Sequence, residues 1–213
     1  MIPVVTIDGP SGSGKGTISK ALAIHLGWNY LDSGLIYRCF AYLTMIGTSN
    51  IPKAIKEIEH NFDQNKEEIL FNDENITSVI RGKEVTMLSS KLSQKPEVRS
   101  QLIEIQKTFR EHPGLVAEGR DMSSKLFPDS LVKIYLTADL KERANRRANQ
   151  LRNDGQKVNI SELKSEIEER ELRDTQRKHS PLVKTDDSIL IDNTGKEVKE
   201  TLDFIEKLVN EKY

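Results

Sequence analysis

Cysteine is nearly absent from this chain, and long apolar segments are missing altogether. The 213 residues include one cysteine, Cys39, so no intramolecular disulfide can form, which fits a reducing cytosol. Cys39 is either a catalytic thiol or a small buried side chain on a helix, and we favour the second. No apolar run approaches the roughly 20 residues of a membrane span, and the N-terminus lacks the regions of a signal peptide. We therefore expect a cytoplasmic protein with no membrane partner.

An excess of one charge is also lacking. The formal net charge is −1, although charged residues make up 31% of the chain. This balance argues against a nucleic-acid partner, which usually needs a positive surface. A length of 213 residues suits a single domain with a hydrophobic core, which we expect over residues 1–213. The histidines show no metal-ligand spacing, and we predict no direct protein ligand for a metal: His25, His60, His112 and His179.

Short apolar runs alternate with stretches of helical periodicity. Apolar, β-branched runs predict buried strands at residues 4–7, 115–118, 132–136 and 189–191. Helices are predicted at residues 15–26, 35–46, 95–112, 139–152, 161–178 and 196–210. Gly27 is expected to end the first helix, and Ser33 to cap the second. Strands that alternate with helices predict an α/β fold with a parallel sheet covered on both faces.

Residues 65–85 break this alternation. They read NKEEILFNDENITSVIRGKEV, in which β-rich runs are separated by the polar turn signals NDEN and RGK. This pattern predicts a small antiparallel insert rather than more of the α/β core.

A glycine-rich loop follows the first predicted strand. Residues 9–15 read GPSGSGK and match G-x-x-x-x-G-K. Glycines let successive backbone N–H groups point at phosphate oxygens, and the helix that begins near Lys15 adds the positive end of its dipole. The Lys15 side chain reaches the β- and γ-phosphates of a bound nucleotide. The loop lies between a predicted strand and a predicted helix, which favours phosphate binding over a turn without function.

The loop departs from the common pattern at one position. Ser or Thr usually follows the lysine, but here Gly16 does, and Thr17 comes next. One step along a helix rotates a side chain by about 100°, so Thr17 need not take the usual magnesium-binding role. The GKGT sequence is similar to the loop of nucleoside monophosphate kinases.

Two predicted helices carry regularly spaced arginines. Arg170, Arg173, Asp174 and Arg177 share the spacing i, i+3, i+4, i+7, which places them on one helix face. The earlier helix repeats the spacing i, i+3, i+4 with three arginines: Arg143, Arg146 and Arg147. Such faces are often solvated and paired with glutamates, but beside a phosphate loop they indicate stabilisation of a transferring phosphoryl group.

The stretch between the two helices is polar. It reads NQLRNDGQKVNIS and contains one glycine. We interpret it as a flexible lid, at about residues 148–163, that closes over a nucleotide and excludes water.

Charged residues also follow predicted strand ends, where ligands bind in open α/β sheets. Arg38 in LDSGLIYR and Arg120 in AEGRDM are candidates for an acceptor phosphate, because a guanidinium matches phosphate oxygens. Asp121 accepts hydrogen bonds from an amino group or hydroxyl, or organises magnesium and its waters. The alternatives are a salt bridge at a helix end for Arg38 and a helix cap for Asp121.

Taken together, these motifs resemble bacterial cytidylate kinases over essentially the whole chain. The matching pieces, in order and spacing, are TIDGPSGSGKGT, LDSGLIYR, GRDM, FPD, VKIYL, EERELRDTQR and DDSILIDNT. One departure is Ser123-Ser124 after GRDM, where relatives often have Gly-Thr. The resemblance implies a monomer that phosphorylates CMP and dCMP with ATP and Mg²⁺. It also implies a P-loop kinase fold: a central parallel five-stranded sheet flanked by helices, a small antiparallel nucleotide-binding insert and a short lid.

The resemblance implies these parts and roles. The core is expected at about residues 1–50 and 106–213, and the CMP-binding insert at about 51–105. The ATP phosphates would contact Gly9, Pro10, Ser11, Gly12, Ser13, Gly14, Lys15, Gly16 and Thr17. The acceptor phosphate side would be lined by Ser33, Tyr37, Arg38 and Arg120. The sugar would be contacted by Arg170 and Asp174. The cytosine edge would be contacted by Ser90, Arg99, Asp121 and Arg177. The expected catalytic residues are Lys15, Arg120, Asp121 and, acting from the lid side, Arg146.

Two alternatives remain open: another small-molecule P-loop kinase, and a nucleotide-binding protein without catalysis. Adenylate and eukaryotic-type UMP/CMP kinases typically carry a TGDLLR-like segment where this chain has DSGLIYR. A regulatory GTPase would need an N-K-x-D motif, which this chain lacks.

Overall fold

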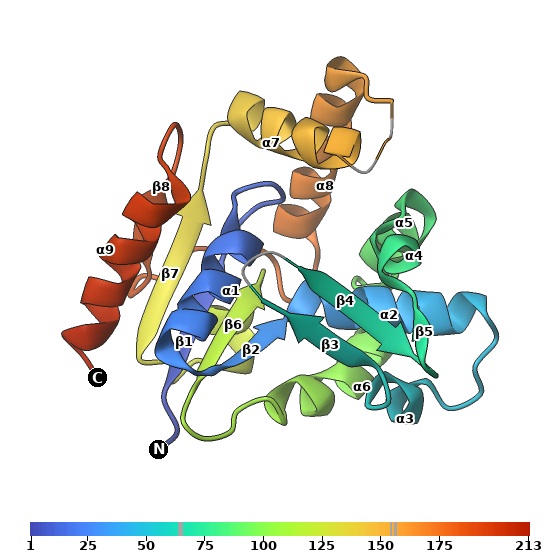
Figure 1. Cartoon of the computed structure of the whole chain (residues 1–213), viewed down its shortest axis with the longest axis horizontal. Coiled ribbons are helices and arrows are strands. Elements are labelled where there is room, and N and C mark those ends of the chain that lie inside the picture. The colour runs from blue at the N-terminus through green and yellow to red at the C-terminus, as the bar shows by residue number, and fades with distance from the viewer. Residues whose placement is uncertain (64–65, 154, 156) are drawn as a thin grey trace.

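Five parallel strands form the centre of the molecule, in the order β2-β6-β1-β7-β8 (Figure 1). The computed structural model describes residues 1–63, 66–153, 155 and 157–213. The strands are β1 (Val4–Asp8), β2 (Asn29–Asp32), β6 (Leu115–Gly119), β7 (Val132–Thr137) and β8 (Ile189–Asp192). The predicted parallel five-stranded sheet is confirmed. The residue pattern alone located four of its strands, because the edge strand β2 has only two fully buried residues, Tyr30 and Leu31.

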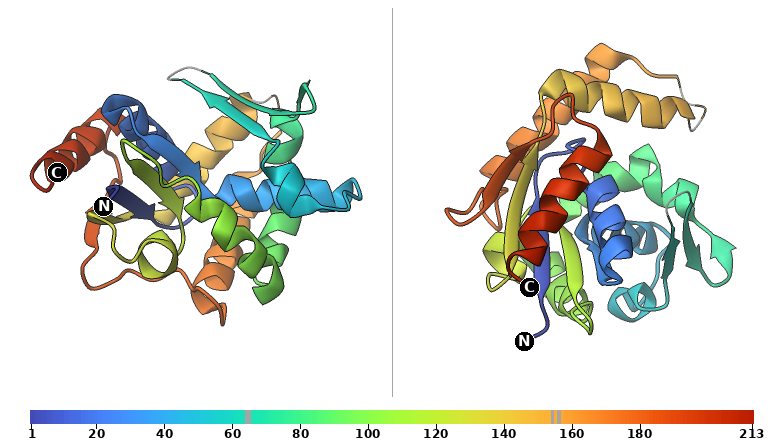
Figure 2. Two further views of the ribbon diagram at one scale, coloured as in Figure 1. Left: turned by 90° about the horizontal axis from the view of Figure 1, so that it is seen from below. Right: turned by 60° about the vertical axis from the view of Figure 1, so that its left-hand side comes forward.

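Helices cover both faces of this sheet. One face carries α1 (Lys15–Leu26) and α9 (Val198–Asn210), which pack on Val5 and Ile7 (Figure 2). The opposite face, which includes Val4, carries three further helices: α2 (Ser33–Met45), α6 (Pro96–Lys107) and the short η1 (Met122–Leu126). Burial on both faces explains why the strands are apolar runs rather than alternating sequences.

The insert combines a small sheet with three helices. Its elements are α3 (Ile51–Ile55), β3 (Glu59–Phe62), β4 (Glu67–Phe71), β5 (Glu74–Asn75), α4 (Thr77–Arg81) and α5 (Lys83–Leu92). The three strands are antiparallel, as predicted. The prediction of β structure was wrong for residues 77–81 and 83–85, which are helical and separated by the bend at Gly82. The reason is visible in the burial: Ile76 and Ile80 are buried four residues apart, while Val79 between them is exposed. Asn65, the first residue of the β-rich stretch 65–85, lies outside the described residues.

Two long helices lie above the carboxyl ends of the strands (Figure 1). These are α7 (Leu140–Asn153) and α8 (Ile160–Gln176), which pack on each other around Ala144, Ala148 and Ile167. Asp154 and Gln156, in the middle of the predicted lid, lie outside the described residues. No helix in the described part of the chain is long and apolar enough to cross a membrane.

Several element ends differ from the sequence predictions. Gly27 ends α1 in a left-handed conformation with φ 62°, as predicted. The cap of α2 is Asp32 rather than Ser33, since its side chain accepts a hydrogen bond from the Leu35 N–H at 2.8 Å. Helix α6 ends at Lys107, short of the predicted His112, which precedes a proline and is therefore disfavoured in a helix.

Candidate active site

Two adjoining cavities open at the carboxyl edge of the central sheet. The larger cavity, about 460 Å³, lies between the phosphate loop, the insert, and helices α7 and α8. The smaller cavity, about 50 Å³, lies between α2, α5 and the end of α8 and has room for only part of a nucleotide. Gly34, Gly119, Arg120 and Arg170 line both cavities, so the two share a wall.

The phosphate loop forms one side of the larger cavity. Gly12 and Gly14 adopt positive φ values of 78° and 91°, which other residues rarely do. A side chain at Gly12 would also meet the backbone oxygen of Arg143 at 3.0 Å. The Lys15 ammonium group donates to the Pro10 carbonyl at 3.2 Å. Burial, with the nearby Arg120 charge, lowers the pKa of Lys15 to about 7.

Glu118 faces Gly16 at the start of α1. A Cβ on Gly16 would lie 3.0 Å from Glu118 Oε1, so the missing side chain leaves room for this carboxylate. The Tyr30 hydroxyl donates to the same oxygen at 2.6 Å. Burial and the neighbouring Asp32 raise the pKa of Glu118 above its ordinary value. Glu118 also lines the larger cavity, which places a buried carboxylate opposite the phosphate loop.

Arginines dominate the wall between the two cavities. Arg120 donates to Asp174 at 2.8 Å and thereby spans from β6 to α8. Arg170 makes no hydrogen bond or ion pair within the described residues, and its buried Nε lacks any acceptor. Burial and the positive charge of Arg120 lower the pKa of Arg170 to about 10. A cation that is held among other cations without a bonded anion favours the binding of an anionic ligand.

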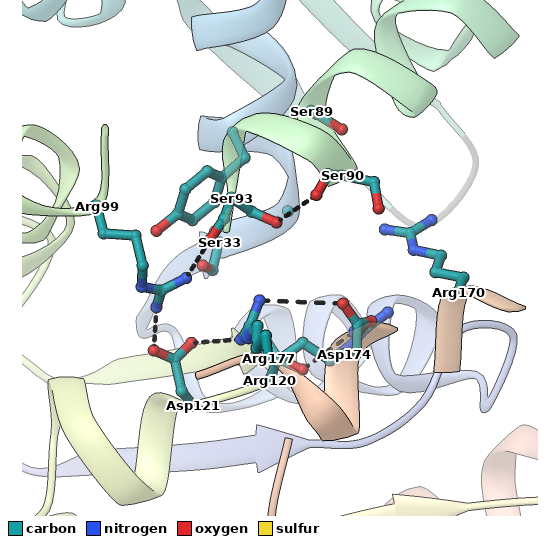
Figure 3. A pocket seen from close by; sticks show the side chains of 13 residues that line it. Ser33, Ser89, Ser90, Ser93, Arg99, Arg120, Asp121, Arg170, Asp174 and Arg177 are labelled. Carbon is teal, nitrogen blue, oxygen red and sulfur yellow. Dashed lines mark hydrogen bonds and ion pairs between the residues drawn. The ribbon is translucent and has the colours of Figure 1, made fainter. Parts of the chain in front are cut away.

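The smaller cavity contains a buried row of opposite charges (Figure 3). Asp121 accepts a hydrogen bond from Arg99, and Arg177 lies 3.8 Å from its other oxygen. Arg99 also donates to the Ser93 carbonyl at 3.1 Å and lies over the Tyr37 ring, 5.5 Å from its centre. A carboxylate between two guanidinium groups offers acceptors and donors side by side, as the polar edge of a base requires.

The three regularly spaced arginines of α7 separate into two groups. Arg143 donates to the carbonyls of Ala138 and Ser11, and it pairs with Glu171 at 2.6 Å. Arg146 donates to Ser13 and Asn193, whereas Arg147 lines the larger cavity. The regular spacing therefore places two arginines against the phosphate loop and one toward the ligand space.

Comparisons with known proteins agree with this geometry. The Cytidylate kinase family model matches residues 5–211. The chain belongs to the cytidylate kinase family. Curated cytidylate kinases from Shewanella putrefaciens and Shewanella baltica OS155 are 44% and 43% identical to it, over 99% of this chain and 96% of theirs. A solved structure of an uncharacterized protein from Eubacterium ventriosum is similar in fold, with a TM-score of 0.54, 13% identity and coverage of 98% of each chain.

The structure brings most of the predicted cytidylate kinase site residues together. The smaller cavity is lined by Ser33, Tyr37, Ser90, Arg99, Arg120, Asp121, Arg170, Asp174 and Arg177. The larger cavity is lined by Ser11, Gly12, Gly14, Lys15, Gly16, Thr17 and Arg38. Arg38 also forms the alternative salt bridge, to Asp32 at 3.0 Å. The η1 helix starts after Asp121, but the Asp121 side chain does not cap it.

Other predicted residues lie outside the two cavities. Gly9, Pro10, Ser13 and Arg146 line neither. Four charged residues at α8 were predicted to share one face, but Arg173 does not line the cavities with the others. Its exposed side chain pairs with Glu169 at 3.6 Å. Arg177 lies just beyond the end of α8.

Sequence reasoning missed several residues that line the cavities. The smaller one includes Ser89 of α5 and Ser93 just after it, and the larger one includes Lys20, Tyr30, Asp32, Glu67, Arg81 and Glu118. A charged residue at the end of a buried strand was a usable signal for Glu118. Glu67 and Arg81 belong to the insert, and nothing in their local sequence indicates that they face the phosphate loop.

Proposed function

We propose that this cytidylate kinase family member transfers the γ-phosphate of ATP to CMP and dCMP, giving CDP or dCDP and ADP. The shared wall of the two cavities is the observation that carries the proposal. The phosphate loop lines the larger cavity and the row of charges around Asp121 lines the smaller one, with Arg120 and Arg170 in the wall between them. Two phosphorylated ligands would therefore meet at these arginines, which is the arrangement that phosphoryl transfer between nucleotides requires.

The chemistry follows from charge and position. A phosphate oxygen of CMP attacks the γ-phosphorus in line, a P–O bond forms, and the bond from that phosphorus to ADP breaks. The attacking oxygen is already anionic near neutral pH, so no strong general base is required. Lys15, Arg120 and Arg170 would neutralise the oxygens of the transferring group. Burial lowers the pKa of Lys15 to about 7, so the bound phosphates would restore its positive charge.

Base selection is assigned to the row of charges around Asp121. Cytosine presents one amino donor and two acceptors, whereas uracil presents a carbonyl in place of the amino group. Asp121 would accept from the amino group, and Arg99 and Arg177 would donate to the acceptors. A carboxylate has about four lone-pair positions, so its existing contacts leave room for another donor. A uracil carbonyl would be repelled by the same carboxylate, and such pairing discriminates by about 10⁴ in favourable sites.

The residues of the larger cavity fit a magnesium ion that is bound mainly through phosphate and water. No cluster of three or more possible metal-ligating His, Cys, Asp or Glu side chains occurs among residues 1–63, 66–153, 155 and 157–213. Mg²⁺ usually retains several waters in nucleotide sites. The buried Glu118 carboxylate and the exposed Thr17 hydroxyl face the cavity and would hold such an ion with the phosphates of ATP. The ion would add positive charge beside the phosphates.

The remaining expectations rest on the family and the composition. We propose a cytoplasmic monomer that acts on small molecules and binds no nucleic acid. Sedimentation of the purified protein tests the monomer. A second, faster-sedimenting species whose share increases with protein concentration would contradict the monomer.

A coupled assay of ADP release tests the function. CMP, dCMP, UMP, AMP, GMP and shikimate are offered as acceptors at equal concentration with ATP and Mg²⁺. We expect turnover to be highest with CMP and dCMP. Preference for AMP, or no turnover with any acceptor, overturns the proposal.

A further inference from the structure

Two carbonyl groups of the phosphate loop, those of Ser11 and Ser13, are bound from outside the loop. The Ser11 carbonyl accepts from Arg143 at 3.3 Å. The Ser13 carbonyl accepts from Asn193 Nδ2 at 3.0 Å and from Arg146 Nη1 at 3.3 Å. Each peptide unit carries its N–H opposite its C=O. A loop whose carbonyls are held outward therefore has its N–H groups turned inward, where phosphate binds.

Asn193 reaches the loop from the far end of the chain. It follows β8, its backbone N–H donates to the Thr137 carbonyl at 2.9 Å, and its side chain is buried. A Cβ on Gly14 would meet Asn193 Nδ2 at 3.1 Å, so the amide lies directly against the loop. The DDSILIDNT motif, which ends with this residue and Thr194, has otherwise no role in the site.

Arg146 is joined to Asn193 by two further hydrogen bonds. Its Nη1 donates to Asn193 Oδ1 at 2.7 Å, and its Nη2 donates to the Asn193 backbone carbonyl at 2.9 Å. The Arg146 Nε donates to Glu142 at 3.0 Å. With the bond to Ser13, these contacts use four of the five N–H donors of the guanidinium. Arg170, by contrast, has a buried Nε without a partner.

We propose that Asn193 and Arg146 are positioning residues that act together on the Ser13 carbonyl and keep the phosphate loop in its binding conformation. The inference rests on the proposed use of ATP. It assigns a role to Asn193, and it moves Arg146 from contact with the transferring phosphate to support of the loop. Arg147, one residue along α7, faces the larger cavity instead.

The proposal predicts a selective effect on ATP. Each single substitution removes one of the two donors to the Ser13 carbonyl, and loss of a buried hydrogen bond typically changes an equilibrium by about tenfold. We expect Asn193→Ala and Arg146→Ala each to weaken ATP binding by about tenfold. The KM for CMP should change less than about threefold, because neither residue lines the smaller cavity. The double variant should bind ATP only slightly less tightly than the single variant with the lower ATP affinity, because Asn193 and Arg146 act on the same carbonyl.

The experiment combines steady-state kinetics with calorimetric titration of ATP in the absence of acceptor. Asn193→Asp provides a second variant that keeps an acceptor for Arg146 but removes the donor to Ser13. It should lose ATP affinity as Asn193→Ala does, with a thermal midpoint close to the parent protein. Arg173→Ala and Asn210→Ala are controls of the same residue types with exposed side chains outside both cavities, and they should bind ATP normally.

Two results would overturn the proposal. One is unchanged ATP affinity in both Asn193 variants. The other is a fall in kcat of more than about a hundredfold for Arg146→Ala alone, with ATP affinity retained, which indicates contact with the transferring phosphate. A parent protein that binds ATP but does not phosphorylate CMP contradicts the proposed function instead, and the ATP titrations still decide the role of Asn193.

Discussion

Glu118 lies against Gly16, and this contact explains why the phosphate loop lacks a side chain after its lysine. The distance from a Cβ on Gly16 to Glu118 Oε1 would be 3.0 Å. Glu118 cannot easily withdraw, because the Tyr30 hydroxyl holds it at 2.6 Å and the strand β6 around it is buried. Gly16 does not have a positive φ, so its need for glycine comes from this neighbour rather than from its backbone.

A Gly16→Ser substitution should therefore destabilise the protein although it restores the commoner loop sequence. Overpacking of this kind typically costs about 1–3 kcal/mol. Shortening the neighbour with Glu118→Asp should recover part of that loss in the double variant, since it withdraws the carboxylate. Urea unfolding of the two single variants and the double variant measures the coupling. Strictly additive free energies would show that the contact with Glu118 is not the cause.

Lys15 should take up a proton when ATP binds above neutral pH. Its pKa is lowered to about 7 in the free protein, first by burial and then by Arg120. At pH 8 the side chain is therefore mostly neutral, and a bound triphosphate restores its charge, with uptake approaching about nine tenths of a proton. Affinity for ATP consequently falls as the pH rises above 7.

Calorimetry at pH 8 in buffers with different ionisation enthalpies measures this uptake. Lys15→Arg is the matched control, because arginine stays charged at every accessible pH and adds no such proton. Equal uptake in the parent protein and the arginine variant would assign the proton to another group.

Asp121→Asn should impair CMP phosphorylation far more than a substitution of an exposed aspartate. The change removes the negative charge that Arg99 and Arg177 share in the smaller cavity and replaces one acceptor with a donor. We expect kcat/KM for CMP to fall by at least about a hundredfold, and selectivity against UMP to decline. Asp203→Asn on the exposed side of α9 is the control.

Stability must be separated from recognition in this variant. Breaking a buried ion pair on one side commonly costs about 3–5 kcal/mol, so thermal unfolding and ATP affinity are measured alongside the kinetics. Unchanged CMP kinetics in a folded protein would remove Asp121 from the recognition of cytosine.

The phosphate loop was predictable because its chemistry is local. The strand, the turn glycines and the helix that bind phosphate follow one another within residues 4–26. Helix α4 could not be predicted in the same way, because isoleucines such as Ile76 and Ile80 are typical of strands. Their helical spacing becomes visible only in their burial against the core. The roles of Arg146 and Arg147 differ although they are neighbours, and Asn193 reaches Ser13 across 180 residues. Such contacts depend on tertiary packing that residue spacing does not encode.

Glu67 joins the insert to the helix that follows the phosphate loop. It lies on β4 and pairs with Lys20 of α1 at 3.0 Å, with His60 at 2.8 Å, and with Arg81 of α4. Burial alone would raise the pKa of this carboxyl, but His60, Arg81 and Lys20 outweigh burial and hold the pKa of Glu67 well below its usual range. The ionised carboxylate is therefore the form that the folded state stabilises.

A Glu67→Gln substitution should remove stability at neutral pH and little at acidic pH. Because the folded-state pKa is lowered, the contribution of Glu67 is complete above the unfolded value of about 4.3 and is lost as the pH falls below it. We expect the variant to unfold more easily by about 2 kcal/mol at pH 7, with the difference from the parent shrinking between about pH 4 and pH 3. Urea unfolding across this range measures it, and Glu104→Gln, from an exposed pair with Lys107, serves as the control. A difference that stays constant with pH would mean that packing, rather than the charge of Glu67, secures the insert to α1.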